Sequence, residues 1–210
     1  MNSKYHIQIT SKALADHFSG RALKTINRAN ICQDSIRNQI AHDWLHFDSN
    51  TFTEGFDYIK KQKEIAVEAI EMGEFKSARA AFGRLLHTWQ DFYSHSNYVR
   101  LWLEANQTTS PEEIIHDDDN ILSHPDLRSG MNYGFLEYLA LLPILTSFIT
   151  PRMPDDSHAK MNLDSPRSGP LFYYAYNAAL KRTTTCYDEL MIELKRLETN
   201  SSLIAGFRDQ

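Results

Sequence analysis

The chain has 210 residues, of which 42% are hydrophobic and 11% aromatic, enough to bury the core of one sizeable domain. Its formal net charge is −5, and its 22 Lys and Arg residues form no basic run. This pattern provides no electrostatic footprint for nucleic acid and no polybasic membrane anchor. We therefore predict a single domain over residues 1–200, followed by a tail or the start of a linker at 201–210.

The cysteines and the N-terminal residues bear on the cellular compartment. Cys32 and Cys186 are too few for a disulfide framework and are not spaced for a metal knuckle. The first residues lack the apolar core of a signal peptide, so the chain as written is expected in the cytoplasm. A fragment that had lost its leader would instead be extracellular.

Helical periodicity dominates the chain, and no strand pattern competes with it. The pattern over residues 53–72 ends at Gly73, a common helix terminator. The fold class is therefore predicted as all-α, a multi-helix bundle. The predicted helices span residues 9–27, 30–50, 53–72, 75–102 and 171–198, and polar loops occupy 104–129 and 150–170.

The longest apolar run, residues 135–149, is interrupted by Glu137 and Pro143. It is too short to span a bilayer, which needs about 20 apolar residues in a helix. We predict a buried helix pair here, or two short helices that meet at the proline. No transmembrane segment is expected.

The most informative stretch is residues 86–97, LHTWQDFYSHSN, which places His87, Asp91 and His95 at i, i+4 and i+8 of one predicted helix. Side chains at this spacing share a helix face, so imidazole and carboxylate groups can converge on a cation. Zinc accepts nitrogen and oxygen ligands in any proportion. A merely solvated polar face is the alternative, but the apolar neighbours of these residues disfavour it.

Three further motifs precede this stretch: HIQIT at 6–10, ANICQD at 29–34 and HFD at 46–48. In this order, the four motifs resemble the Het-C domain, a helical family related to the zinc-dependent phospholipases C and single-strand nucleases. The resemblance implies a metal site between the helices, holding one to three zinc ions. The implied metal ligands are His6, Asp34, His46, His87, Asp91 and His95.

Other residues are expected to support these ligands. Asp48 is predicted to accept a hydrogen bond from a ligand histidine, because metal-bound imidazoles usually donate their other N–H to a carboxylate. His42 lies four residues before His46, so it either replaces that residue or supports a ligand. Asp34 is the candidate catalytic residue that orients or deprotonates a metal-bound water. His158, in a loop rich in proline and acidic residues, is predicted to be solvated.

Two classes of function follow from the resemblance. The first is an enzyme, a zinc-dependent phosphodiester hydrolase of phospholipase C type acting on phospholipid, with peripheral membrane contact. Tyr93, Trp44 and Phe47 would then line the mouth of the site, or would simply be core aromatics. The alternative is a non-catalytic Het-C-like domain with structural zinc, acting in self-recognition through a protein partner or a membrane. The absence of a downstream H-x-x-x-E pair favours the alternative, and the intact upstream set favours the enzyme.

Overall fold

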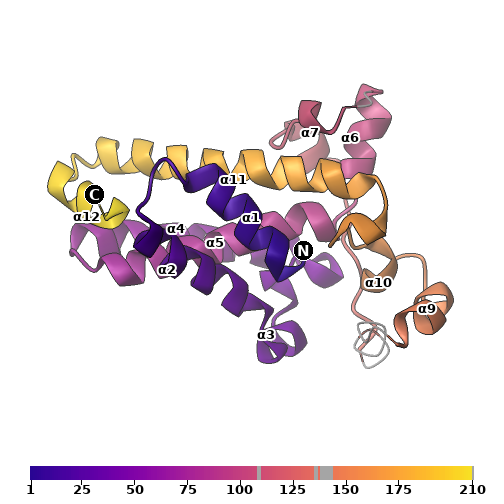
Figure 1. Cartoon of the computed structure of the whole chain (residues 1–210). Helices are drawn as coiled ribbons and strands as arrows, with labels where there is room; N and C mark the ends of the chain where they lie inside the picture. Colours follow the sequence, from indigo (N-terminus) through magenta and orange to yellow (C-terminus); the bar gives the residue numbers. More distant parts are fainter. Residues whose placement is uncertain (108–109, 135–136, 138–143, 210) are drawn as a thin grey trace.

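The structure, a computed structural model, describes residues 1–107, 110–134, 137 and 144–209. It confirms the predicted all-α fold, since the described residues contain helices and only two isolated β-bridges (Figure 1). None of the described helices has the length and apolar character needed to cross a membrane. The long helices are α1 (Ser3–Leu14), α2 (Gly20–Ile31), α4 (Phe52–Glu71), α5 (Phe75–His95) and α11 (Leu171–Arg196).

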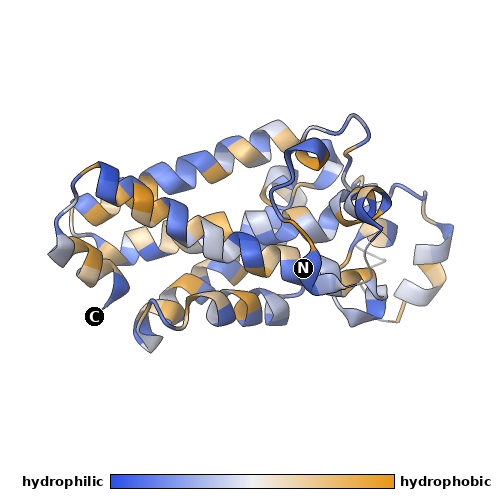
Figure 2. Ribbon diagram, turned by 90° about the horizontal axis from the view of Figure 1, so that it is seen from above, coloured by the Kyte–Doolittle hydropathy of each residue, from blue (hydrophilic) through white to orange (hydrophobic). Residues whose placement is uncertain are grey.

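Helix α5 is the centre of the bundle. The helices α2, α4 and α11 all pack against it, and α1 lies against α2 and α11. Most long helices show polar and apolar residues on different sides (Figure 2), as expected for amphipathic helices at the surface of a core. Helix α5 differs, because every residue from Leu85 to His95 is buried, including the polar ones.

The apolar core is rich in aromatic rings. The ring of Phe47 lies 5.2 Å from that of Phe92 and 5.0 Å from that of Phe56, and Trp89 lies 5.5 Å from Phe56. Phe47 and Tyr93 are both fully buried. These two residues are therefore core aromatics, and the prediction that they line the mouth of a site is wrong for both.

The predicted helix over 9–27 is two helices in the structure. Helix α1 ends at Leu14, and the Ser19 side chain accepts a hydrogen bond from the Ala22 N–H at the start of α2. Serine is a preferred N-cap, and this cap marks the break that hydrophobic periodicity alone did not reveal. The chain reversal between the helices allows α1 to pack against α2.

The predicted helix over 75–102 is also divided. Helix α5 ends at His95, and Ser96 adopts an extended backbone with ψ of 167°. The Asn97 N–H then donates to the Arg128 carbonyl at 2.9 Å rather than to the preceding turn. Helix α6 (Tyr98–Asn106) begins after this break.

The segment 30–50, predicted as one polar helix, is a series of short turns. It contains α3 (Ile36–Ala41) and the 3₁₀ turns η1 (Cys32–Asp34), η2 (Asp43–Leu45) and η3 (Asp48–Asn50). Phe47 between the last two has a φ of 59°, a left-handed conformation that no continuous helix contains. These turns give Asp34, His46 and Asp48 independent orientations.

The two predicted loops contain short helical elements. The first holds η4 (Pro111–Glu113) and α7 (Asp119–Leu122), and the Asp118 side chain caps α7 by accepting the Asn120 N–H. The second holds η5 (Thr150–Arg152), α10 (His158–Met161) and η6 (Pro166–Ser168). The final predicted helix, 171–198, corresponds closely to α11.

Residues 201–210 are not a tail over their described part. Ser201–Arg208 form α12, which packs against α4 and α5. Phe207 is fully buried, and the Arg79 guanidinium donates to the carbonyls of Gly206 and Phe207 at 2.5 and 2.8 Å. The prediction of a tail or linker is corrected here, because these contacts join α12 to the bundle.

The prediction of a buried helix pair over 135–149 falls mainly on residues outside the described part, namely 135–136 and 138–143. The described end of this run contains α9 (Thr146–Ile149). Two large apolar side chains at this end of the run are not buried, since Ile144 is 89% exposed and Phe148 is 69% exposed. For these residues the prediction of burial is wrong.

Gly83 sets how closely α2 approaches α5. A Cβ added at Gly83 would lie 2.3 Å from the Ile26 carbonyl oxygen, and backbone cannot move aside as a flexible side chain can. Gly83→Ala is therefore expected to lower the free energy of unfolding by about 1–3 kcal/mol in urea denaturation. Gly20→Ala is the control, since a Cβ there meets nothing within 4 Å. Equal midpoints for the two variants would contradict this packing.

Candidate functional site: two histidine–aspartate clusters

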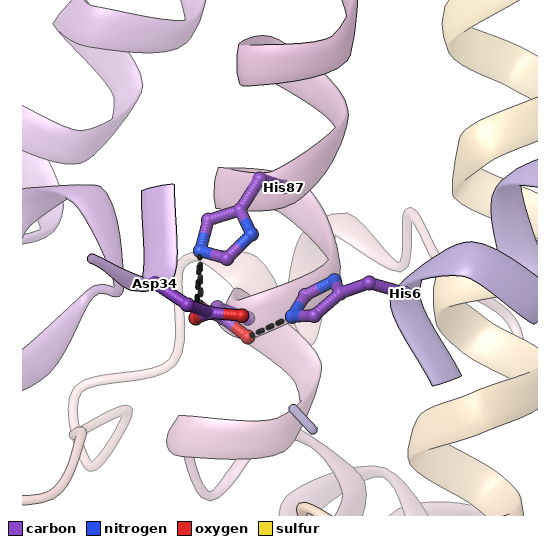
Figure 3. Close-up of side chains that lie close together, drawn as sticks. His6, Asp34 and His87 are labelled. Carbon is purple, nitrogen blue, oxygen red and sulfur yellow. Dashed lines mark ion pairs between the residues drawn. The ribbon is translucent and has the colours of Figure 1, made fainter. Parts of the chain in front are cut away.

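Four residues from three separate elements form a buried cluster, which we call the first cluster: His6, Asp34, His87 and Asp91. His6 comes from α1, Asp34 from η1, and the other two from α5. Each offers one potential ligand atom, and these atoms all lie within 4.8 Å of one another. Figure 3 shows His6, Asp34 and His87 pointing toward one point. The structure thus brings together residues that lie up to 85 positions apart in the sequence.

Asp91 is the centre of the first cluster. Its Oδ1 atom lies 3.1 Å from His6 Nε2, and its Oδ2 atom lies 3.0 Å from His87 Nε2. The Nδ1 atom of His46 is 2.8 Å from Asp91 Oδ2 and 3.1 Å from His87 Nε2. His46 therefore adjoins the first cluster, as predicted from its motif.

Amide side chains fix the orientation of two imidazoles. The His6 Nδ1–H donates to Gln90 Oε1 at 2.6 Å, which turns Nε2 toward Asp91. The His87 Nδ1–H donates to Asn30 Oδ1 at 3.3 Å, which turns its Nε2 toward the same carboxylate. A hydrogen bond to one ring nitrogen fixes the tautomer and leaves the lone pair on the other. Both rings thus present a lone pair to the centre of the cluster.

Burial governs the charge of the first cluster. Burial lowers the pKa of His87 to about 4, against the opposing effect of the Asp91 carboxylate, so this imidazole is neutral at pH 7. Burial alone would raise the pKa of Asp91, but the Met1 amine and the nearby imidazoles hold it well below its usual value. A neutral imidazole beside an ionised carboxylate is the protonation state in which both groups bind a metal ion.

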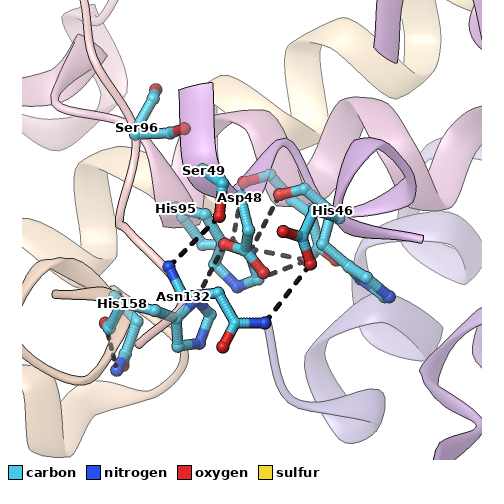
Figure 4. A network of polar contacts seen from close by, with 12 residues as sticks. His46, Asp48, Ser49, His95, Ser96, Asn132 and His158 are labelled. Atoms are coloured by element: carbon cyan, nitrogen blue, oxygen red, sulfur yellow. Dashed lines mark hydrogen bonds and ion pairs between the residues drawn. The ribbon is translucent and has the colours of Figure 1, made fainter. Parts of the chain in front are cut away.

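His95 does not join the first cluster, although it shares a helix face with His87 and Asp91. Eight residues of α-helix rise about 12 Å, which separates His95 from His87. Its Nε2 atom is 3.9 Å from Asp91 Oδ1. His95 instead lies with Asp48 and His158, whose potential ligand atoms are all within 4.8 Å of one another (Figure 4). We call these three residues the second cluster.

The second cluster differs from the prediction for two residues. His158, predicted as solvated, has its Nδ1 atom 2.7 Å from Asp48 Oδ1, so that prediction is wrong. Asp48, predicted to support a ligand histidine, contacts two imidazoles, with His95 Nδ1 at 3.4 Å. Asp164 lies at the edge, 3.1 Å from His95 Nε2. Burial lowers the pKa of His95, but neighbouring carboxylates, with Asp91 and Asp48 foremost, raise it to about 10.

The sequence does not identify two residues of the site, His158 and Asp164, and it misassigns a third, His42. No local spacing marks His158 or Asp164, because they reach the site through contacts between separate segments, such as those of Gly130 and Leu163 with the end of α5. His42 was predicted to replace His46 or to support a ligand, but it lies with its ring centre 4.6 Å from that of Trp44. Since His46 occupies the position next to Asp91, the first of these two roles for His42 is wrong.

A cavity of about 280 Å³ borders both clusters. Asp34 and His46 line it from the first cluster's side, and the whole second cluster lines it with Asp164. His6, His87 and Asp91 do not belong to its lining and are fully buried. The predicted catalytic role of Asp34 remains a prediction, although this residue does face the cavity.

Comparison with known proteins gives a family. The family described as "VWA7 N-terminal domain" matches residues 3–128, more than half of the chain. Von Willebrand factor A domain-containing protein 7 of rat (Rattus norvegicus), mouse (Mus musculus) and human (Homo sapiens) is 36% identical over 80 residues in each case. The matched segment is 38% of this chain and 9% of the length of these relatives. No solved structure matches.

These findings correct the resemblance to the Het-C domain. The family that matches the motif-bearing residues 3–128 is a different one, and no Het-C or phospholipase C relative accompanies it. The predicted activity, a phospholipase C acting on phospholipid, rested on that resemblance and is overturned with it. The same holds for the alternative of a Het-C-like self-recognition domain. The chain belongs to the VWA7 N-terminal domain family.

Proposed function

We propose that this domain binds a divalent transition metal ion, zinc in the first place, at the first cluster. The observation that carries the proposal is the convergence of four potential ligand atoms, from His6, Asp34, His87 and Asp91, within 4.8 Å. Two imidazoles and two carboxylates are a ligand set that zinc accepts readily.

The separations within the first cluster suit a zinc ion. Ligand atoms about 2.0–2.1 Å from a tetrahedral ion lie about 3.3 Å from one another. The distances from His6 Nε2 and His87 Nε2 to Asp91 are 3.1 and 3.0 Å, and His87 Nε2 is 3.6 Å from Asp34 Oδ1. The apposed atoms therefore need only small movements to take positions around an ion.

The charge of the first cluster also supports a cation. Its two carboxylates, Asp34 and Asp91, face neutral His87, and Asp91 is fully buried. A buried ionised carboxylate is costly unless it is paired or coordinates a metal, and in this structure the Met1 amine pairs with Asp91. A divalent ion would neutralise both carboxylates at once.

The proposed ion has a clear structural consequence. Its ligands would come from α1, from η1 and from α5, and the chain between them folds into separate helices. A ligand that binds only the native state stabilises that state by linkage. The ion would therefore fasten α1 and the η1 turn to the central helix.

His87→Ala tests this proposal. The wild-type chain, purified without chelator, is expected to contain zinc or another divalent transition metal by elemental analysis, and chelation is expected to lower its melting temperature. His87→Ala is expected to lose the metal of the first cluster and the corresponding sensitivity to chelator, because it removes a fully buried potential ligand. His124→Ala is the matched control, since the side chain of this loop histidine is 36% exposed and pairs with its neighbour Asp126.

Two results would reject the proposed metal site at the first cluster. Metal content near zero in wild-type protein that resists reloading with zinc would reject the proposal. So would an unchanged metal content and melting temperature in His87→Ala, because a ligand atom of the first cluster would then be dispensable. Far-ultraviolet circular dichroism of the variant confirms that any loss of metal occurs in a folded chain.

A further inference from the structure

The second cluster places two imidazoles at a single carboxylate. In it, the two imidazoles of His95 and His158 face the carboxylate of Asp48, and their ring centres are only 4.5 Å apart. A single histidine is enough to pair one carboxylate. A second imidazole at the same carboxylate, with Asp164 3.1 Å from His95 Nε2, forms a set of nitrogen and oxygen donors typical of a transition-metal site.

The backbone around the second cluster is built to hold it. The Gly130 N–H donates to the His95 carbonyl at 2.9 Å, and the Gly130 carbonyl accepts the N–H of Ser49, the neighbour of Asp48, at 2.8 Å. A Cβ on Gly130 would lie 2.6 Å from the Cα of His158. One glycine thus contacts all three ligand-bearing segments, and its lack of a side chain permits the approach of His158.

Further hydrogen bonds fix these segments. The His158 N–H donates to the Met131 carbonyl at 2.9 Å, and the Met131 N–H donates to the Asp156 carbonyl at 2.7 Å. The side chain of Asn50 accepts the Ser129 N–H at 2.7 Å. Four stretches of chain therefore meet in a defined arrangement, which a solvated loop histidine would not require.

All three residues of the second cluster line the cavity, whereas of the first cluster only Asp34 does. Asp48, His95 and His158 all line the cavity of about 280 Å³, together with Asp164. The side chains of Asp48 and His158 are 13% and 14% exposed, whereas those of His87 and Asp91 are fully buried. A metal ion at the second cluster would exchange with solvent through the cavity, and one at the first cluster would exchange slowly.

We propose that Asp48, His95 and His158 form a second, exchangeable site for a divalent transition metal ion, with Asp164 beside it. This site uses none of the four residues of the first cluster, so it extends the proposed function rather than restating it. Its ion joins the end of α5 to η3 and to α10, three elements that are distant in sequence.

Metal stoichiometry tests this proposal. The 210-residue chain, stripped with chelator and titrated with zinc, is expected to bind two equivalents. A chelating dye added to the loaded protein is expected to remove one equivalent rapidly and the other slowly. His158→Ala and Asp48→Asn are each expected to lose the rapidly exchanging equivalent and to keep the slow one. His87→Ala is expected to show the reverse, and His124→Ala is expected to retain both.

The variants separate this proposal from the proposed function. One equivalent that is lost in His87→Ala but kept in His158→Ala and Asp48→Asn would overturn the second site and leave the first. One equivalent with the opposite dependence would support the second site and reject the first, and no binding would reject both. Asp48→Asn nearly conserves shape, so it tests the ligand role even if His158→Ala fails to fold.

Discussion

Asp91→Asn is expected to abolish the stabilisation that zinc at the first cluster gives this domain, while leaving its helical circular dichroism nearly unchanged. Asp91 offers one oxygen to His6 and the other to His87 and His46, so it is the group that all three imidazoles share. The amide keeps the shape of the side chain but removes the charge that attracts a cation. At free zinc about 1,000-fold above Kd, the wild type should gain about 4 kcal/mol of stability from one site.

The comparison uses thermal unfolding with and without zinc. Asp126→Asn is the control, since the Asp126 side chain is 82% exposed and belongs to neither cluster. It should show the full zinc-dependent rise in melting temperature. If Asp91→Asn shows the same rise as the wild type, the Asp91 carboxylate is not a metal ligand, and the first cluster is held by hydrogen bonds and ion pairs alone.

Local spacing predicted the part of the site that lies within one helix. His87 and Asp91 are four residues apart, and their side chains meet at 3.0 Å. The same reasoning assigned His95 to the same ion, but helical rise carries it to the second cluster. Spacing on a helix therefore predicts a shared face, whereas a shared ion also requires the residues to be within one turn of each other.

Spacing along one helix could not predict the site residues that come from other elements. His6, Asp34 and His46 were placed by motif order, and the structure does bring them to Asp91, although the family that suggested them was wrong. His158 was missed because its position depends on backbone contacts with Gly130 and Met131, which no local pattern encodes.

Helix boundaries were predicted least well where polar residues end a helix by tertiary contacts. The Asn97 N–H bonds to Arg128, which ends α5 at His95, and neither residue signals this break locally. The predicted end at Gly73 was correct because the signal is local: Gly73 has a φ of 74°, a conformation that glycine adopts readily. The helical class itself followed from periodicity and is confirmed.

Gln90 is the buried polar residue whose loss is expected to destabilise the fold most. Its Oε1 atom accepts hydrogen bonds from His6 and Asn30, and its Nε2 atom donates to Thr10 and Thr183. These partners come from α1, α2 and α11, so one side chain links three helices to α5. Gln90→Met has nearly the same length but makes none of these bonds.

Gln90→Met is therefore expected to lower the free energy of unfolding by about 3 kcal/mol or more in urea denaturation, because each buried partner left unpaired costs about 1–3 kcal/mol. It should also weaken zinc binding at the first cluster about 10- to 100-fold, since His6 loses the bond that orients its ring. Gln8→Met, on the exposed face of α1, is the matched control and should change neither quantity. A Gln90→Met variant as stable as the control would show that the four bonds contribute little, and unchanged zinc affinity in it would show that His6 needs no orienting partner.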